Sequence, residues 1–204
     1  MKEMQSKQTE AIKEQMASGE IYFENEEILA EQAGYRDLLF QFNHTLPSKT
    51  AEKQAILEKL LGAFGEGSYI EPPFSANWGK NTFFGKGVYA NSHLTLVDDT
   101  KIMVGDRVMM GPNVSLCTAG HPLSPELRRQ AAQFNKPVTI GDNVWLGAGV
   151  TVLPGVTIGE NTVIGAHSLV TKDVPANVLA FGTPCQVIRQ LSSEEQLPNG
   201  EGLR

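Results

Sequence analysis

Four histidines are the side chains in this sequence best suited to moving a proton near neutral pH, because an imidazole ordinarily titrates there. They are His44, His93, His121 and His167. His121 is the strongest candidate for a general base, since it lies in the segment Thr118-Ala119-Gly120-His121-Pro122, which interrupts a repeat found on either side. A loop histidine alone is more often a surface residue, so its role depends on the elements that position it.

Length and composition limit the kinds of protein that can carry this histidine. The chain has 204 residues, of which 41% are hydrophobic and 20% charged, with a formal net charge of −6. No apolar run approaches the roughly 18 residues of a membrane span. The acidic balance argues against a nucleic-acid binder with a broad basic surface. Residues 1–17 lack the apolar core of a secretion signal, and two cysteines, Cys117 and Cys185, are too few for a disulfide framework. We therefore expect one domain with a small appendage, in the cytoplasm.

A period of six residues describes the chain from Trp78 onward. Aliphatic residues, usually followed by glycine, open consecutive hexads at Ile140, Leu146, Val152, Ile158 and Ile164. The same frame extends back through Leu116, Met110 and Val104, shifts by two residues near Asp98-Asp99, and continues through Leu96, Ala90, Phe84 and Trp78. Asp98 is expected only to cap this shift.

Such a period predicts a prism whose walls are flat strands and whose edges are turns. The first residue of each hexad points inward and stacks on its counterparts in neighbouring coils, while the small residue after it fits a crowded corner. The frame is lost over residues 118–137, but Leu116 and Ile140 are 24 residues apart, a multiple of six, so a loop is predicted there that preserves the register. A β-sandwich with evenly spaced glycine turns is the less favoured alternative.

The first 71 residues follow a different pattern. They hold 13 acidic and 7 basic residues, whereas residues 72–204 hold 10 of each, and all 15 valines lie at or after Val88. Asn25 or a neighbour can cap one helix, and Pro47-Ser48 opens another whose apolar residues recur on one face. We therefore expect a helical region over residues 1–71, a repeat domain over 72–189 and a C-terminal tail over 190–204.

The hexads are accompanied by segments that resemble one known family. Together with Tyr89-Ala90-Asn91, Val97-Asp98-Asp99, the His121 loop and the ending Gly182-Thr183-Pro184, they look like the hexapeptide-repeat acetyltransferases, and most closely the maltose and galactoside O-acetyltransferases, from about Met16 to Arg189. The resemblance implies a mainly β fold, a left-handed parallel β-helix with a small N-terminal α-helical region and a protruding loop. It also implies a homotrimer with active sites between subunits.

The resemblance further implies acetyl-CoA as donor, a hydroxyl of a maltose, glucose or galactoside type sugar as acceptor, and direct transfer with no metal. His121 would be the general base and Asn91 would orient the reacting groups, while Asp99 would receive sugar hydroxyls. An amide and a carboxylate can indeed donate to and accept from a vicinal diol. Glu24 stands near the position of an aspartate in the galactoside enzyme, and Trp78 can offer a flat apolar wall, so both are expected to bind the acceptor.

The same resemblance places the coenzyme along the C-terminal coils. The residues expected to contact it are Trp145, Ala148, Ala166, Thr171, Lys172 and Arg189. Small residues permit close approach of the pantetheine arm, and Lys172 and Arg189 supply cations for phosphates. Gln186 replaces an arginine or lysine common in the family, and of the arginines common in its helical region only Arg36 is present.

Three alternatives remain open. The acceptor hydroxyl can belong to an antibiotic or other xenobiotic, or the prism can be a non-catalytic scaffold. Carbonic-anhydrase-like relatives of the same fold use three histidines to hold zinc, which ordinarily needs at least two closely spaced ligands. The gaps here, 28 residues from His93 to His121 and 46 from His121 to His167, disfavour zinc.

Overall fold

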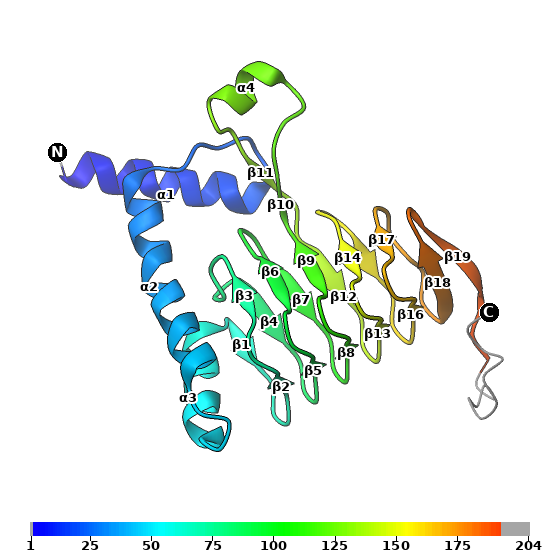
Figure 1. Ribbon diagram of the computed structural model, residues 1–204. Coiled ribbons are helices and arrows are strands. Elements are labelled where there is room, and N and C mark those ends of the chain that lie inside the picture. Colours follow the sequence, from blue (N-terminus) through cyan, green and yellow to red (C-terminus); the bar gives the residue numbers. More distant parts are fainter. Residues whose placement is uncertain (1, 193–204) are drawn as a thin grey trace.

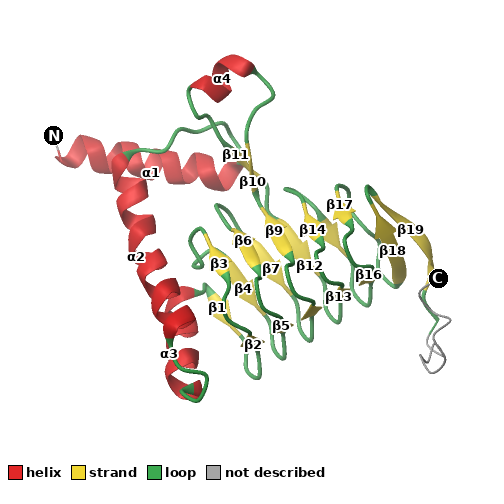
Figure 2. Ribbon diagram, in the orientation of Figure 1, coloured by secondary structure: helices red, strands yellow, loops and turns green. Residues whose placement is uncertain are grey.

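A three-sided prism of parallel strands forms most of the molecule, with helices at one end and a loop that projects from one edge (Figure 1). The computed structural model describes residues 2–192, with side chains from residue 7 onward. The predicted C-terminal tail therefore falls outside the described residues from position 193 on. The predicted fold class, mainly β with a parallel β-helix, an N-terminal helical region and a protruding loop, is confirmed (Figure 2).

Three sheets form the walls of the prism, and they are numbered by the order in which their first strands occur along the chain. Sheet I contains β1 (Ala63–Phe64), β4 (Thr82–Phe84), β7 (Ile102–Val104), β12 (Val138–Ile140) and β15 (Thr157–Ile158). Sheet II contains β2 (Tyr69–Ile70), β5 (Tyr89–Ala90), β8 (Met109–Met110), β13 (Trp145–Leu146), β16 (Val163–Ile164), β18 (Val178–Gly182) and the antiparallel β19 (Cys185–Gln190). Sheet III contains β3 (Ser75–Ala76), β6 (Thr95–Val97), β9 (Ser115–Cys117), β14 (Thr151–Val152) and β17 (Leu169–Val170).

The core of the prism is built from the residues that open the hexads. In sheet I, Val104 pairs with Phe84 on one side and Ile140 on the other, and all three side chains are buried. Glycine follows these residues because the coils meet closely at the corners. A Cβ at Gly105 would lie 2.3 Å from Oδ1 of Asp142 and 2.8 Å from its backbone nitrogen. The pairing of Val104 with Ile140 also confirms that the intervening loop preserves the register.

At the edge between sheets III and I, here called the III/I edge, the spacing between successive inward-pointing residues departs from six. The predicted two-residue shift is confirmed, since the buried residues Leu96 and Val104 are eight apart. A second shift was missed. Ala76, not Trp78, pairs with Leu96 and precedes Phe84 by eight residues, so the position predicted for Trp78 in the inward row is wrong. The six-residue spacing from Trp78 to Phe84 imitated the repeat because both side chains are large and apolar.

The helical region covers the first coil of the prism. It consists of α1 (Lys2–Ser18), α2 (Glu26–His44) and α3 (Thr50–Leu60). The predicted cap is confirmed, because Oδ1 of Asn25 accepts a hydrogen bond from the amide of Ile28 at 2.9 Å. Strands β1 and β2 precede Pro72, so the prism begins within the segment that the sequence assigned to helices.

Trp78 packs in a second, smaller core beneath α1 and α2. Its buried partners there are Ile12, Met16, Tyr22 and Ile28. None of the described helices is long and apolar enough to cross a membrane.

Candidate active site

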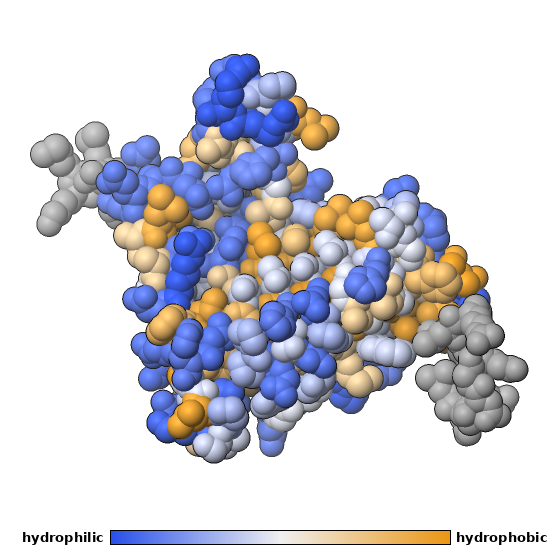
Figure 3. Space-filling view, viewed as in Figure 1, coloured by the Kyte–Doolittle hydropathy of each residue, from blue (hydrophilic) through white to orange (hydrophobic). Residues whose placement is uncertain are grey.

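The protruding loop that carries His121 rises from the III/I edge. It begins with β10 (Ala119–Gly120), which pairs antiparallel with β11 (Phe134–Asn135), and α4 (Pro125–Arg129) lies at its far end (Figure 1). Figure 3 shows the loop as a mostly hydrophilic projection. The ring of Phe134 packs against Gly120, the residue directly before His121. A Cβ at position 120 would lie only 2.9 Å from this ring.

The ring of His121 is exposed and has a defined hydrogen-bonding arrangement. Its Nδ1 lies 2.8 Å from the carbonyl oxygen of Ala132. A carbonyl can only accept, so Nδ1 carries the proton and the neutral ring presents the lone pair of Nε2. His121 is therefore held in the tautomer that a general base requires.

Two carboxylates share this site with His121. Burial raises the pKa of Glu24, and the charge of Asp99 raises it further, while a hydrogen bond with Gln133 and the charges of Arg36 and His121 act in the opposite direction. Glu24 thus lies within electrostatic reach of both Asp99 and His121. The structure therefore brings these three predicted residues together: Asp99 and His121 lie at the III/I edge, and Glu24 lies on the N-terminal segment between α1 and α2.

Asp99 is almost completely buried and is held by two donors. Nδ2 of Asn77 donates to its Oδ2 at 2.7 Å, and Nε1 of Trp78 donates to its Oδ1 at 3.4 Å. Burial raises the pKa of Asp99, and these hydrogen bonds partly offset that effect. The neighbouring Asp98 has the structural role expected of it, because its carboxylate accepts from the amide of Trp78 and the hydroxyl of Thr82.

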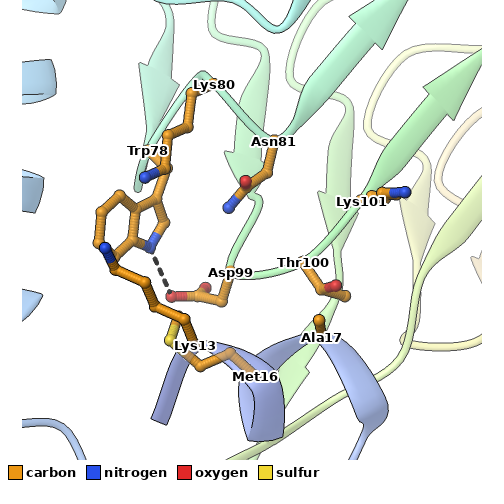
Figure 4. Close-up of a pocket in the computed structure, with 9 residues that line it drawn as sticks. All are labelled: Lys13, Met16, Ala17, Trp78, Lys80, Asn81, Asp99, Thr100 and Lys101. Carbon is orange, nitrogen blue, oxygen red and sulfur yellow. Dashed lines mark hydrogen bonds between the residues drawn. The ribbon is translucent and has the colours of Figure 1, made fainter. Parts of the chain in front are cut away.

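A cavity of about 250 Å³ opens beside Asp99 and Trp78. Figure 4 shows the indole joined to Asp99 by its hydrogen bond, with Lys13 and Met16 of α1 below Asp99 in this view. Trp78 is only 2% exposed, and Nζ of Lys80 lies 4.6 Å from the centre of its ring. The indole therefore offers the cavity its edge and its bond to Asp99, and not an open ring face.

Polar residues that were not predicted from the sequence tie the loop to the N-terminal segment. Tyr22 and Gln133 exchange backbone hydrogen bonds of 3.0 Å, and the hydroxyl of Tyr22 lies 3.3 Å from Oδ1 of Asn135. Nδ2 of Asn135 in turn donates to the carbonyl oxygens of Met16 and Asp99 at 3.1 and 3.3 Å. No repeat or motif spacing marks these residues, because their partners lie more than 30 positions away.

Asn91 lies elsewhere in the same chain. It follows β5 at the edge between sheets II and III, the II/III edge, where its Oδ1 accepts from the amide of Ser92 at 2.8 Å. Asp99 and His121 follow β6 and β9 at the III/I edge, one wall away. A single chain therefore does not bring Asn91 together with His121.

The predicted coenzyme residues also divide between these edges. Ala148 and Ala166 lie on the II/III edge with Asn91, where the amide of His167 donates to the carbonyl of Ala148 at 2.7 Å. Thr171 and Lys172 follow β17 at the III/I edge. Trp145 and Arg189 lie on sheet II, and both are exposed.

Sheet II carries an apolar row on its outer surface. Tyr69, Tyr89, Met109 and Trp145 occupy paired positions in β2, β5, β8 and β13. Each of the four is between 36% and 49% exposed. Tyr69 and Tyr89 stack with their ring centres 6.3 Å apart. This row runs beside the edge that carries Asn91.

Known families match both parts of this architecture. A bacterial transferase hexapeptide (six repeats) model matches residues 137–172, and the maltose acetyltransferase hexapeptide capping motif matches residues 15–65. The chain is 55% identical to the galactoside O-acetyltransferase of Lactococcus lactis subsp. lactis (strain IL1403) over 178 residues, covering 86% of each protein. The chain belongs to the maltose and galactoside O-acetyltransferase family. The resemblance inferred from the sequence is thereby confirmed.

Solved structures of the same family superimpose on this acetyltransferase. A maltose O-acetyltransferase from Clostridium difficile 630 matches with a TM-score of 0.87 and 41% identity, over 89% of this chain and 97% of the other. A galactoside acetyltransferase in complex with coenzyme A matches with a TM-score of 0.87 and 40% identity, over 89% and 91%. This chain is therefore an acyltransferase, and the solved relatives include a coenzyme A complex.

The other chemical candidates in this acetyltransferase show no comparable arrangement. Within residues 7–192, whose side chains the structure describes, no group of three His, Cys, Asp or Glu side chains is placed to hold a metal ion. Cys117 and Cys185 are half-buried free thiols, and burial raises the pKa of each.

Proposed function

We propose that this chain transfers the acetyl group of acetyl-CoA to a hydroxyl of a sugar of the maltose, glucose or galactoside type, with His121 as general base. The observation that carries the proposal is the hydrogen bond between Nδ1 of His121 and the Ala132 carbonyl, which keeps the proton of the neutral ring on Nδ1 and its lone pair on Nε2. An alcohol is a weak nucleophile until its proton is removed, and a positioned imidazole is matched to that step.

The reaction proceeds directly between two bound substrates. Nε2 of His121 takes the proton from the acceptor hydroxyl as its oxygen bonds to the acetyl carbonyl carbon. The carbon–sulfur bond then breaks, and the proton passes from His121 to the departing thiolate, which restores the neutral ring. Asp99 and Glu24 accept hydrogen bonds from neighbouring sugar hydroxyls, and Trp78 acts at this site by fixing Asp99.

A complete site on this scheme needs a second copy of the chain. Asn91 lies one prism wall away from His121, and Ala148 and Ala166 share its edge. In a homotrimer, the II/III edge of one subunit can face the III/I edge of the next. The exposed apolar row on sheet II supports this arrangement, because burying Tyr89, Met109 and Trp145 against a neighbour is favourable. Asn91 then donates its amide to the reacting groups held by His121 of the adjacent subunit.

The donor would lie along the same junction. Ala148 and Ala166 leave room for the pantetheine arm, Trp145 lies against it, and Thr171, Lys172 and Arg189 approach its polar and phosphate groups. The related galactoside acetyltransferase in complex with coenzyme A supports a donor of this class.

The test compares two histidines that make the same hydrogen bond. His44 also places Nδ1 at 2.8 Å from a backbone carbonyl, that of Phe40, but it lies in the last turn of α2, and the histidine whose charge acts on Glu24 is His121. We expect His121→Ala to lower kcat by about 10²- to 10⁴-fold while leaving coenzyme A binding unchanged, and His44→Ala to retain activity. Release of free CoA thiol is measured with a panel of sugars and antibiotics.

Each outcome of that assay separates the candidate functions. Turnover on sugars that depends on His121 supports the proposal, and turnover on antibiotics alone assigns a xenobiotic acetyltransferase. Near-native turnover in His121→Ala would remove His121 from the mechanism. No turnover on any acceptor, together with no coenzyme A binding, would favour a scaffold.

A further inference from the structure

A single peptide group lies between His121 and the N-terminal segment. Nδ1 of His121 bonds to the carbonyl oxygen of Ala132, and the amide of the same peptide bond, that of Gln133, donates to the carbonyl oxygen of Tyr22 at 3.0 Å. A trans peptide is planar, and its C=O and N–H point in opposite directions. Tyr22 and His121 therefore bind opposite sides of one rigid unit.

This arrangement makes the state of the imidazole depend on Tyr22. The exposed ring of a neutral histidine can carry its proton on either nitrogen, and the hydrogen bond that one nitrogen makes decides which. The Ala132 carbonyl selects Nδ1 only while its peptide group keeps its present direction. Donation by the amide of Gln133 to Tyr22 also polarises this peptide group and strengthens its carbonyl as an acceptor.

Tyr22 can hold the peptide group because its own position is fixed by packing. Its side chain is 0% exposed and lies in the small core with Met16 and Trp78. A second backbone bond of 3.0 Å runs from the amide of Tyr22 to the carbonyl of Gln133, so the two residues form an antiparallel pair. The side chains of such a pair leave the backbone on the same face, where they can contact each other.

The hydroxyl of Tyr22 ties this pair to the strand that leads back from the loop into the prism. It lies 3.3 Å from Oε1 of Gln133 and 3.3 Å from Oδ1 of Asn135 in β11. Burial raises the pKa of Tyr22, and the charge of Asp99 raises it further, so the hydroxyl keeps its proton and can donate. Removing the hydroxyl alone leaves the ring in the core but releases these two acceptors.

We propose that Tyr22 is a positioning residue for His121, acting through the peptide group between Ala132 and Gln133. The inference rests on the proposed function, in which His121 is the general base. The buried side chain of Tyr22 contributes to the reaction only by fixing the direction of the Ala132 carbonyl, and thereby the nitrogen of His121 that carries the proton.

The experiment measures the tautomer of His121 by nitrogen-15 NMR of the full chain with labelled histidine, without substrates and at a pH where the ring is neutral. The signals of His121 are those that disappear in His121→Ala. We expect wild type to show one form, protonated at Nδ1, and Tyr22→Phe to show a mixture with the form protonated at Nε2. The kcat of Tyr22→Phe should fall by about 3- to 10-fold, as expected for one lost hydrogen bond, with the KM for acetyl-CoA unchanged.

The matched control is Tyr35→Phe. Tyr35 packs against the same small core, and its hydroxyl has no hydrogen-bond partner within residues 7–192. Its removal should leave both the tautomer of His121 and kcat at their wild-type values. A loss of the Nδ1-protonated form in this control as well would overturn the proposal, because any small change in the core would then move the ring.

A double variant separates positioning from a general loss of structure. If Tyr22 acts through His121, Tyr22→Phe should have no further effect on the residual CoA thiol release of His121→Ala. An equal fold-loss in both backgrounds, or a single Nδ1-protonated form in Tyr22→Phe, would overturn the proposal. The tautomer is measured without substrates, so it tests the hold on His121 even where His121→Ala retains turnover, a result that would refute only the assignment of His121 as base.

Discussion

Two inactive variants of this chain are expected to restore each other's activity when they assemble together. Asn91 and His121 lie at different edges of the prism, so the proposed site takes Asn91 from one subunit and His121 from its neighbour. An assembly of Asn91→Ala chains has no site with the amide, and an assembly of His121→Ala chains has no site with the base. In the proposed homotrimer, a mixed assembly contains some sites in which both residues are intact.

The size of the recovery follows from the geometry. With equal amounts of the two variants, half of all sites receive an intact His121 from one subunit. Independently, half of all sites receive an intact Asn91 from the neighbouring subunit. About a quarter of all sites are therefore complete, and activity should reach about a quarter of wild type. Residues that act within one chain would give no complete site in any mixture.

The assay uses co-expression of the two variants with different affinity tags, purification through both tags, and measurement of CoA thiol release. Selecting mixed trimers through both tags raises the expected recovery to about a third, because each such trimer has one complete site in three. Co-expression of His121→Ala with His44→Ala is the matched control, since every site then keeps Asn91. Activity no higher than that of the separate variants would refute the shared site.

Three further predictions concern stability. The pKa of Asp98 is raised to about 7 by burial from an unfolded value of 3.8, so the folded state holds its proton more tightly. Proton binding by Asp98 therefore stabilises the folded state at low pH, and this stabilisation is lost as pH rises from about 4 to 7. Asp98→Asn has no such proton to lose, so its free energy of unfolding relative to wild type should rise over this window by on the order of 4 kcal/mol, measured by urea unfolding. Asn25→Ala should lower the free energy of unfolding by about 0.5–2 kcal/mol, because it removes the cap of α2. Lys49→Ala changes a position that makes no side-chain cap and should alter the free energy of unfolding by less than about 0.5 kcal/mol. Equal losses in the two variants would contradict the capping argument. Gly111→Ala should destabilise, since its Cβ would lie 2.7 Å from the amide nitrogen of Ala148, while Gly34→Ala in α2 meets no atom within 4 Å and should stabilise by about 0.5–1 kcal/mol. Opposite shifts in the thermal midpoint of these two variants are the result that checks the close approach of the coils.

The repeat made the prism predictable from the sequence, because each inward position repeats the same physical requirement. Ile140, Leu146 and Val152 open successive walls, and the structure buries all three. The helical region was predicted less completely. Its cap at Asn25 follows from a local rule, but the burial of Trp78 against Tyr22 and Met16 depends on how the helices dock, which no periodicity encodes.

The candidate site was predictable only where it follows a motif. His121, Asp99 and Glu24 were named from the family resemblance, and the structure brings them together. Asn77 and Gln133 hold two of these residues but were not predicted, because a polar pair distant in the chain has no local signature.

The III/I edge explains why these residues meet at all. In three successive coils the chain leaves the six-residue pattern at this edge: at Asn77-Trp78, at Asp98-Asp99 and at the loop over residues 118–137. Because neighbouring coils are stacked in register, extra residues at the same edge must lie against one another. The first insertion therefore donates its hydrogen bonds to the second, and the third, which carries His121, donates to the carbonyl of Asp99 through Asn135. The fourth coil returns to six residues between Val152 and Ile158, where no further side chain is added to this cluster. The regular hexads thus supply a rigid frame, and the chemistry lies where one edge of that frame is interrupted.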